Sequence, residues 1–244
     1  MQLQFIGCGD AFGSGGRFNT CFRVTASKTN FLIDCGASSL VAMRKLGVEP
    51  NSIPTIFITH LHGDHFGGLP FFILDAQFAS RRSTPLTIAG PPGLKARLQA
   101  AQEVLFPGSA ALARKFKMTI VELEPQKPQM VNGVRVFPHL VKHECGAPPF
   151  ALRLEVDGKA VAYSGDTEWT DALIAAGDGV DLFVIESYFY EKSAWYHLDW
   201  PTLRSHLPKV KAKRVILTHF SAEMLTHLDE VDVETAEDGK VVEI

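Results

Sequence analysis

Four side chains able to bind a metal ion lie within six consecutive positions of the sequence: His60, His62, Asp64 and His65. Neutral imidazole and carboxylate are ligands that zinc, manganese and iron accept. The preceding residues, 55–58, are rich in β-branched and aromatic types and predict a buried strand. Glycines and a proline follow at 67–70, so the cluster should lie on a loop that leaves a strand end. We therefore expect these side chains to converge on a metal rather than to form a solvated polar turn.

Three further polar residues lie at or near the ends of predicted strands. Asp166 follows an apolar run at 160–164, His219 follows another at 214–218, and His143 follows Val141 and Lys142. Seven ligands are too many for one four- or five-coordinate ion and suit two. His139 competes with His143 for one place, and Cys145 is a less favoured ligand nearby.

Composition predicts an ordinary globular protein of 244 residues, with 46% hydrophobic and 21% charged residues. A net charge of −3 gives no basic footprint for general nucleic-acid binding. No window approaches the roughly 18 apolar residues that a membrane helix needs, and the N-terminus shows no signal peptide. The four cysteines form no CxxC pair and are expected to be reduced and mostly buried. These features predict a cytoplasmic protein.

Strand and helix patterns alternate through both halves of the chain. The expected strands cover 2–6, 20–25, 30–35, 53–60, 86–89, 117–123, 134–139, 150–156, 160–164, 181–185 and 214–218. The expected helices cover about 38–46, 67–82, 94–105, 171–176 and 201–207. This order predicts two sheets face to face with helices outside. Residues 231–233 and 240–244 are expected to pair around Asp238-Gly239, and the glycine-rich stretch 7–16 should form a tight loop rather than a phosphate cradle.

The sequence resembles the metallo-β-lactamase superfamily, whose HxHxDH signature stands here as His60-x-His62-x-Asp64-His65. It is most similar to the ribonuclease Z-like branch of phosphodiesterases. That similarity rests on Gly165-Asp166-Thr167, on Thr218-His219-Phe220-Ser221 and on the stretch 86–93, and it extends from the first strand to about residue 221. It implies an α/β fold, the four-layer αββα sandwich. The chain, 1–244, would be a single domain of two halves, about 1–120 and 121–244.

The resemblance also implies roles. His60, His62 and His143 would hold one divalent ion, Asp64, His65 and His219 a second, and Asp166 would bridge them. His143 is preferred to His139 because Phe150-x-x-Arg153 follows at the branch's spacing. Zinc is the favoured metal, with manganese or iron open. Two ions about 4 Å apart can share a hydroxide that attacks phosphorus.

Two catalytic residues are expected beside the ions. Asp64 would orient the attacking water and accept its proton. His197 is the candidate acid for the leaving group, and a surface histidine before a helix capped by Asp199 is the alternative. Glu186 is either a support for a ligand or for His197, or a plain strand-end carboxylate.

The expected substrate is a small phosphodiester or nucleotide, such as a cyclic nucleotide or an aryl diester. Ribonuclease Z carries a tRNA-gripping arm between its third histidine and its bridging aspartate, but here only 23 positions separate His143 from Asp166. Tight tRNA binding is therefore not expected, and the basic runs at 81–82 and 209–214 are predicted to be solvated. Aromatic residues that could wall the pocket are Trp169, Tyr188, Phe189, Tyr190, Trp195, Tyr196 and Trp200.

Alternatives remain open. One is a ribonuclease Z-type tRNA 3′ processing endonuclease, another a lactonase or thioesterase on the same site, and the third a non-catalytic metal-bound domain. The apolar stretch 69–74 would suit a homodimer face or, equally, the protein core.

Overall fold

The computed structural model describes residues 1–192 and 195–244, and it consists of two mixed β-sheets. The first sheet has seven strands in the order β13-β1-β2-β3-β4-β5-β6. Its strands are β1 (Gln2–Gly7), β2 (Cys21–Thr25), β3 (Asn30–Ile33), β4 (Thr55–Phe57), β5 (Leu86–Gly90), β6 (Met118–Glu122) and β13 (Val241–Glu243). The second sheet has six strands in the order β12-β11-β10-β9-β8-β7. These are β7 (Gln129–Val131), β8 (Val134–Leu140), β9 (Phe150–Val156), β10 (Lys159–Tyr163), β11 (Leu182–Glu186) and β12 (Val215–Thr218).

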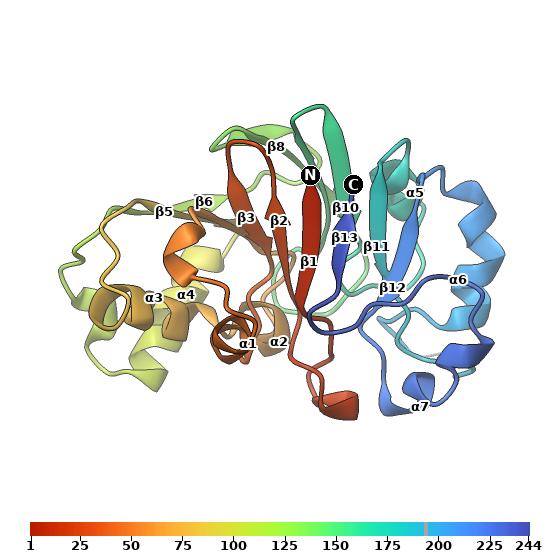
Figure 1. Cartoon of the computed structure of the whole chain (residues 1–244), viewed down its shortest axis with the longest axis horizontal. Helices are drawn as coiled ribbons and strands as arrows, with labels where there is room; N and C mark the ends of the chain where they lie inside the picture. Colours follow the sequence, from red (N-terminus) through yellow and green to blue (C-terminus); the bar gives the residue numbers. More distant parts are fainter. Residues whose placement is uncertain (193–194) are drawn as a thin grey trace.

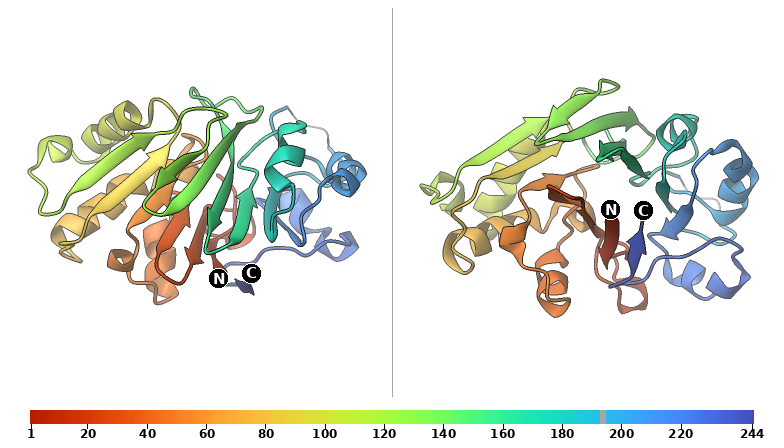
Figure 2. Two further views of the ribbon diagram at one scale, coloured as in Figure 1. Left: turned by 90° about the horizontal axis from the view of Figure 1, so that it is seen from above. Right: turned by 45° about the horizontal axis from the view of Figure 1, so that its top comes forward.

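Helices cover the outer face of each sheet, and the strands lie between the two helical layers (Figure 1). The α-helices are α1 (Ser39–Lys45), α2 (Gly63–Phe66), α3 (Leu69–Phe78), α4 (Leu94–Leu105), α5 (Ala172–Gly177), α6 (Trp200–His206) and α7 (Ala222–Leu225). The views of Figure 2 show the same division, with the helices of the first half on one side and those of the second on the other. The predicted pair of sheets with outer helices is confirmed.

Three apolar clusters hold these layers together. The cluster between the sheets includes Phe5 and Phe22 of the first sheet and Leu152 of the second. Alternate strand residues point outward, because successive side chains of a strand face opposite sides of a sheet. Leu32 thus packs under α1, α3 and α4, and Ala162 packs under α5 and α6. Burial of both faces explains why the central strands are almost continuously apolar.

Parallel pairing brings several strand ends to the same side. β3 runs parallel to β4 in the first sheet, and β10, β11 and β12 run parallel in the second. The carboxyl ends of parallel strands lie at one edge of a sheet, and ligands bind there in open α/β folds. The polar residues that follow these strands therefore meet at a common rim.

Two predictions about local structure are wrong. Residues 231–233 form no hairpin with 240–244, because β13 pairs antiparallel with β1 and Leu3 lies opposite Val242. Arg82 is not solvated. It is 2% exposed, and its guanidinium donates hydrogen bonds to the carbonyl oxygens of Pro50 at 2.7 Å and Ile53 at 2.8 Å.

The structure also bears on the cysteines, the dimer face and the membrane. All four cysteines are buried and free. Leu69, Phe72 and Ile73 pack in the core, so the packing alternative applies to them, whereas Phe71 is exposed. A homodimer stays a prediction.

Among the described residues, no helix has the length and apolar character needed to cross a membrane.

Candidate metal centre

The seven predicted ligands come from five segments that converge on the rim. His60 and His62 follow β4, and His143, Asp166 and His219 follow β8, β10 and β12. Asp64 and His65 lie in the single turn of α2. The structure gathers these side chains into two adjoining groups. The first contains His60, His62 and His143, and the second Asp64, His65, Asp166 and His219; within each group the ligand atoms lie within 4.8 Å of one another.

Asp166 lies between the two groups. Its Oδ1 is 3.2 Å from Nε2 of His65, and its Oδ2 is 3.5 Å from Nε2 of His219, both in the second group. The same Oδ2 is 3.7 Å from Nε2 of His60 and 3.9 Å from Nε2 of His143 in the first. A carboxylate that faces both sets of imidazoles is suited to bridge two ions.

The chemistry of these groups fits divalent cations. Nε2 of His60 and Oδ1 of Asp166 are buried and make no hydrogen bond among the described residues; the 3.2 Å contact of Oδ1 with His65 lacks hydrogen-bond geometry. Such atoms normally cost stability, about 1–3 kcal/mol each, unless a cation uses their lone pairs. Burial lowers the pKa of His60 well below its ordinary value, and the charge of His65 lowers it further. The imidazole is therefore neutral, as metal binding requires.

Two glycines let the ligand loop lie close to the end of β3. A Cβ on Gly36 would lie 2.1 Å from the carbonyl oxygen of Asp64, and one on Gly68 would lie 2.2 Å from that of Gly36. The backbone amide of Cys35 donates to the oxygen of His65 at 2.7 Å. Any larger residue at these two positions would push the ligand loop away from the strand end.

Asp34 belongs to the centre, although it was not among the residues predicted from the sequence. It is fully buried at the end of β3, and its Oδ2 lies 2.7 Å from Nδ1 of His65. The amide and hydroxyl of Thr59 both donate to Asp34 at 2.8 Å. This carboxylate fixes the ring of His65, so that Nε2 points toward Asp64 and Asp166. Asp34 falls inside the strand predicted at 30–35, whereas β3 ends at Ile33, so Asp34 did not stand out as a strand-end residue.

Replacing Asp34 by alanine should weaken zinc binding about 10- to 100-fold, the range typical for loss of a carboxylate that orients a ligating histidine. The ring of His65 would lose its buried acceptor. Competition with a chromophoric chelator measures the affinity, and circular dichroism checks the fold. Unchanged zinc affinity in a folded Asp34→Ala protein would exclude this orienting role.

His197 and Glu186 form a pair beside the two groups. Nδ1 of His197 lies 2.9 Å from Oε2 of Glu186, whose other oxygen accepts from the amide of Thr167. Burial alone would lower the pKa of His197, but the Glu186 carboxylate outweighs it and raises that pKa to about 9. His197 also lies near enough to His143, Asp166 and His219 to belong to further possible ligand groups.

His143, not His139, lies within the cluster. Its Nε2 is 3.0 Å from Nδ1 of His62, and its Nδ1 lies 2.9 Å from the carbonyl oxygen of Tyr196. His139 stays in β8, where its ring stacks on Phe137. Cys145 is outside the ligand groups found among the described residues.

A pocket of about 340 Å³ opens over the centre. Its lining includes His62, Asp64, Asp166 and His219 from the ligand groups, and also His197. Among the seven aromatic residues considered from sequence, Tyr188 contributes to this lining. Trp169 instead stacks on His206 and Tyr190 on His227, while Trp200 is buried in the outer core.

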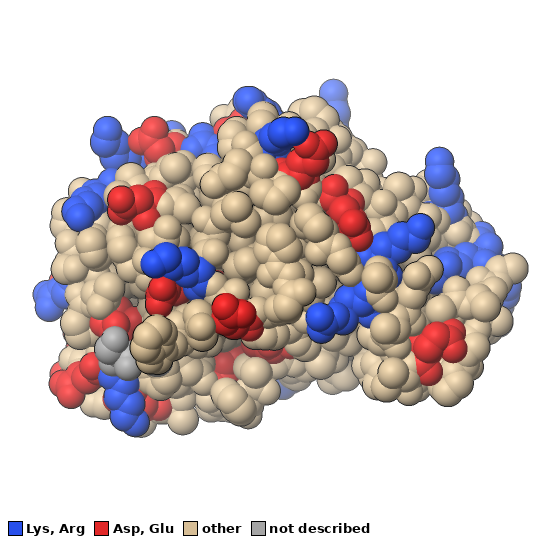
Figure 3. All heavy atoms as spheres, turned by 180° about the vertical axis from the view of Figure 1, so that it is seen from behind, with Lys and Arg blue, Asp and Glu red and all other residues tan. Residues whose placement is uncertain are grey.

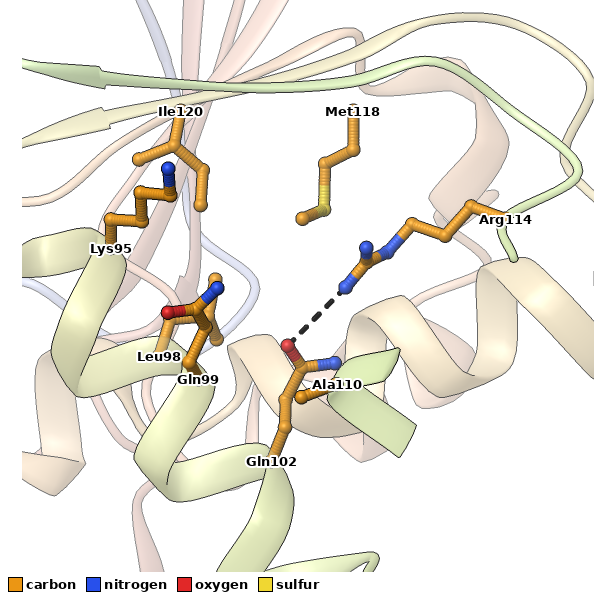
Figure 4. Close-up of a pocket in the computed structure, with 8 residues that line it drawn as sticks. All are labelled: Lys95, Leu98, Gln99, Gln102, Ala110, Arg114, Met118 and Ile120. Atoms are coloured by element: carbon orange, nitrogen blue, oxygen red, sulfur yellow. Dashed lines mark hydrogen bonds between the residues drawn. The ribbon is translucent and has the colours of Figure 1, made fainter. Parts of the chain in front are cut away.

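A second cavity, of about 240 Å³, lies away from the centre between α4 and β6 (Figure 4). Arg114 and Gln102 approach each other across it, with 3.4 Å between the guanidinium and the amide oxygen. No histidine, cysteine or carboxylate is among its lining residues within the part of the chain that the structure describes. It has none of the ligands of the metal centre.

A family model described as anti-Pycsar protein Apyc1 matches residues 1–240, almost the whole chain. The chain belongs to the anti-Pycsar protein Apyc1 family. This member is also 28% identical to a protein named ribonuclease Z from Exiguobacterium sp., with 98% of the chain and 94% of that relative covered. A ribonuclease Z from Methanothermobacter thermautotrophicus is 26% identical over 91% of the chain and 88% of its own length.

Solved structures confirm the predicted fold for this Apyc1-family chain. The short form of human tRNase Z superposes with a TM-score of 0.80 at 24% identity, covering 100% of the chain and 99% of that structure. Zn²⁺-bound PqqB from Methylobacterium extorquens superposes with a TM-score of 0.77 at 16% identity, covering all of both chains. The fold is the metallo-β-lactamase sandwich. With its buried His/Asp cluster and its relatives, the chain is a metal-dependent hydrolase that binds divalent metal.

Proposed function

We propose that this protein is a dinuclear phosphodiesterase acting on a small phosphodiester or nucleotide. The observation that carries the proposal is the position of Asp166 between two complete ligand groups. Relatives named ribonuclease Z support phosphodiester chemistry, because a ribonuclease cleaves phosphodiesters. His60, His62 and His143 would hold one ion, Asp64, His65 and His219 the other, and Asp166 would contact both. Zinc is the favoured ion for this set of ligands.

Two bound cations would lower the pKa of a water molecule towards 7 and neutralise charge on phosphoryl oxygens. Asp64 lines the pocket and is held by Nε2 of His219 at 3.2 Å. It can orient the attacking water and take its proton. On the leaving-group side, His197 carries a proton that it can donate to the departing alkoxide, and Glu186 keeps the donor atom aimed at the pocket.

The surface supports a small substrate rather than a tRNA. Acidic side chains lie among the basic ones on the face shown in Figure 3. In the basic run at 209–214, Lys213 pairs with Asp181 at 2.9 Å and Arg214 with Glu234 at 2.7 Å. Tight tRNA binding requires several lysines or arginines free to contact phosphates.

The alignment with the Exiguobacterium relative also favours a small substrate over a tRNA. It spans 291 positions, so at least 47 of them (291 less 244) have no counterpart in this chain. Between His143 and Asp166 the chain forms the strands β9 and β10, which pair as a hairpin joined at Asp157-Gly158.

Ribonuclease Z activity is the second candidate, because the named relatives cover nearly the whole chain. A single substrate panel separates the alternatives. Protein reconstituted with Zn²⁺ or Mn²⁺ should hydrolyse bis(p-nitrophenyl) phosphate and cyclic nucleotides faster than a lactone or a thioester, and should trim a tRNA precursor poorly. Efficient trimming would favour the ribonuclease, faster lactone or thioester turnover would favour the other hydrolases, and inactivity with full metal occupancy would favour a non-catalytic domain.

A further inference from the structure

One large apolar side chain on the wall of the metal pocket is open to solvent. Phe12 lines the pocket over the metal centre and is 83% exposed. Most phenylalanines of the chain that the structure describes lie in its cores, as Phe5 and Phe22 do. An isolated exposed phenylalanine on a protein surface needs no explanation. An exposed phenylalanine beside a candidate catalytic centre, on a loop held by hydrogen bonds, does need an explanation.

A buried carboxylate holds the loop that carries Phe12. Asp10 is fully buried, and its Oδ1 accepts from the amides of Phe12 at 3.2 Å and Ser14 at 2.9 Å. Its Oδ2 accepts from the hydroxyl of Ser14 at 2.7 Å and from that of Tyr188 at 3.3 Å. Tyr188 is another wall of the same pocket. The loop is thereby tied to the pocket it borders, and a pre-ordered contact surface loses less entropy when a ligand binds.

Apart from the histidines of the metal centre, the described lining of the pocket has no cationic side chain for the rest of a ligand. Its described lining includes no lysine or arginine. The bound metal ions would attract the phosphoryl group of a substrate, so the rest of the substrate depends on other contacts. Phe12 provides the face of an aromatic ring. Stacking on an aromatic ring suits any nucleobase, because each base has a π-face.

The size of the pocket fits a single nucleotide. Its volume of about 340 Å³ lies at the small end of the range for small-molecule sites. Phe12, Asp64 and Asp166 line this one pocket, so a nucleotide with its phosphate at the metal centre would place its base toward the loop. This points to one nucleotide unit, with its phosphate at the centre and its base at the rim.

We propose that Phe12 is the stacking platform for the nucleobase of a nucleotide phosphodiester. It is a specificity-determining residue, and the buried carboxylate of Asp10 holds its backbone amide. The inference rests on the proposed phosphodiesterase function, because that function places the phosphate of the nucleotide at the metal centre. The stacking contact itself is measurable without turnover.

A binding measurement tests the contact directly. Zinc-loaded full-length protein is titrated with adenosine 5′-monophosphate, and proton NMR follows the base protons while calorimetry gives the affinity. Stacking over Phe12 should shift the base protons upfield. Phe12→Ala should abolish that shift and weaken binding about tenfold, and Phe12→Tyr should restore both. Val104→Ala removes another exposed apolar side chain, 80% exposed on α4, and should change neither. An unchanged shift and affinity in Phe12→Ala would overturn the proposal.

Measurements of turnover distinguish a failure of this stacking proposal from a failure of the proposed phosphodiesterase function. Thymidine 5′-(p-nitrophenyl phosphate) and methyl p-nitrophenyl phosphate share a leaving group, and only the first retains a base. Phe12→Ala should lower kcat/KM about tenfold for the thymidine ester, mainly through KM, and less than twofold for the methyl ester. Equal losses on both would make Phe12 merely structural and overturn the proposal. If wild-type protein hydrolyses neither ester while the NMR shift still depends on Phe12, the proposed function fails and the stacking site stands.

Discussion

Replacing Asp166 by asparagine is expected to lower metal-dependent hydrolysis of bis(p-nitrophenyl) phosphate by a factor on the order of 10³. The substitution keeps the shape of the side chain and removes the charge that faces both ligand groups. Burial would raise the pKa of Asp166, but His219, His65 and His60 outweigh it, so the pKa lies well below its ordinary value. The carboxylate is therefore ionised and available to two cations.

Metal content is the second measurement for Asp166→Asn. Plasma emission spectroscopy should show fewer than two ions per chain, because a neutral amide is a poor bridging ligand. Asp181→Asn is the matched control. That carboxylate pairs with Lys213 at 2.9 Å, outside the ligand groups, and its loss should leave turnover and metal content unchanged. An Asp166→Asn protein with two ions and full activity would refute the bridging role.

The second large effect concerns His197. Its replacement by alanine should slow kcat by about 10² to 10⁴, the range for loss of a general acid, with the metal content intact. Nδ1 of His197 lies 2.9 Å from Oε2 of Glu186, which leaves Nε2 as the atom that can donate, and His197 lines the pocket. His206→Ala is the control, because that ring stacks on Trp169 in the outer helical layer. Loss of bound metal from His197→Ala would instead identify His197 as a ligand.

The pH dependence gives an independent check on this assignment. Activity that needs protonated His197 is present below its pKa and is lost as the pH rises through it. The pKa lies at about 9 because the carboxylate of Glu186 outweighs burial, and bound cations nearby would move it downward. Glu186→Gln removes the cause that raises this pKa, so the alkaline limb of kcat should shift to lower pH. A limb that stays in place would exclude His197 as the titrating acid.

Much of the centre was predictable because several of its ligands come directly after apolar strands in the sequence. His60, Asp166 and His219 each follow an apolar strand, and parallel strand ends meet at one rim. The predicted sheets with outer helices follow from the same patterns. Ligand identity and strand position are both visible in a single sequence.

The features that escaped prediction depend on contacts distant in sequence. Asp34 supports His65 from 31 positions away. Asp238 looked like the corner of a hairpin, but its carboxylate accepts from the amides of Cys8 at 3.0 Å and Phe18 at 2.8 Å. Arg82 was expected to be solvated because charged side chains usually are, yet in the interior its guanidinium donates hydrogen bonds to backbone carbonyl oxygens. No local pattern encodes such partners.

The division of the ligands between the two sheets has a consequence for unfolding. His60 and His65 belong to the first half, while His143 and His219 belong to the second. An ion held by both halves binds only when the sheets are docked, so its binding energy is added to their association. Denaturation should then release metal and separate the two halves in one cooperative transition. The metal content of a sample thus sets a lower limit on the fraction of molecules in which the two halves are natively docked.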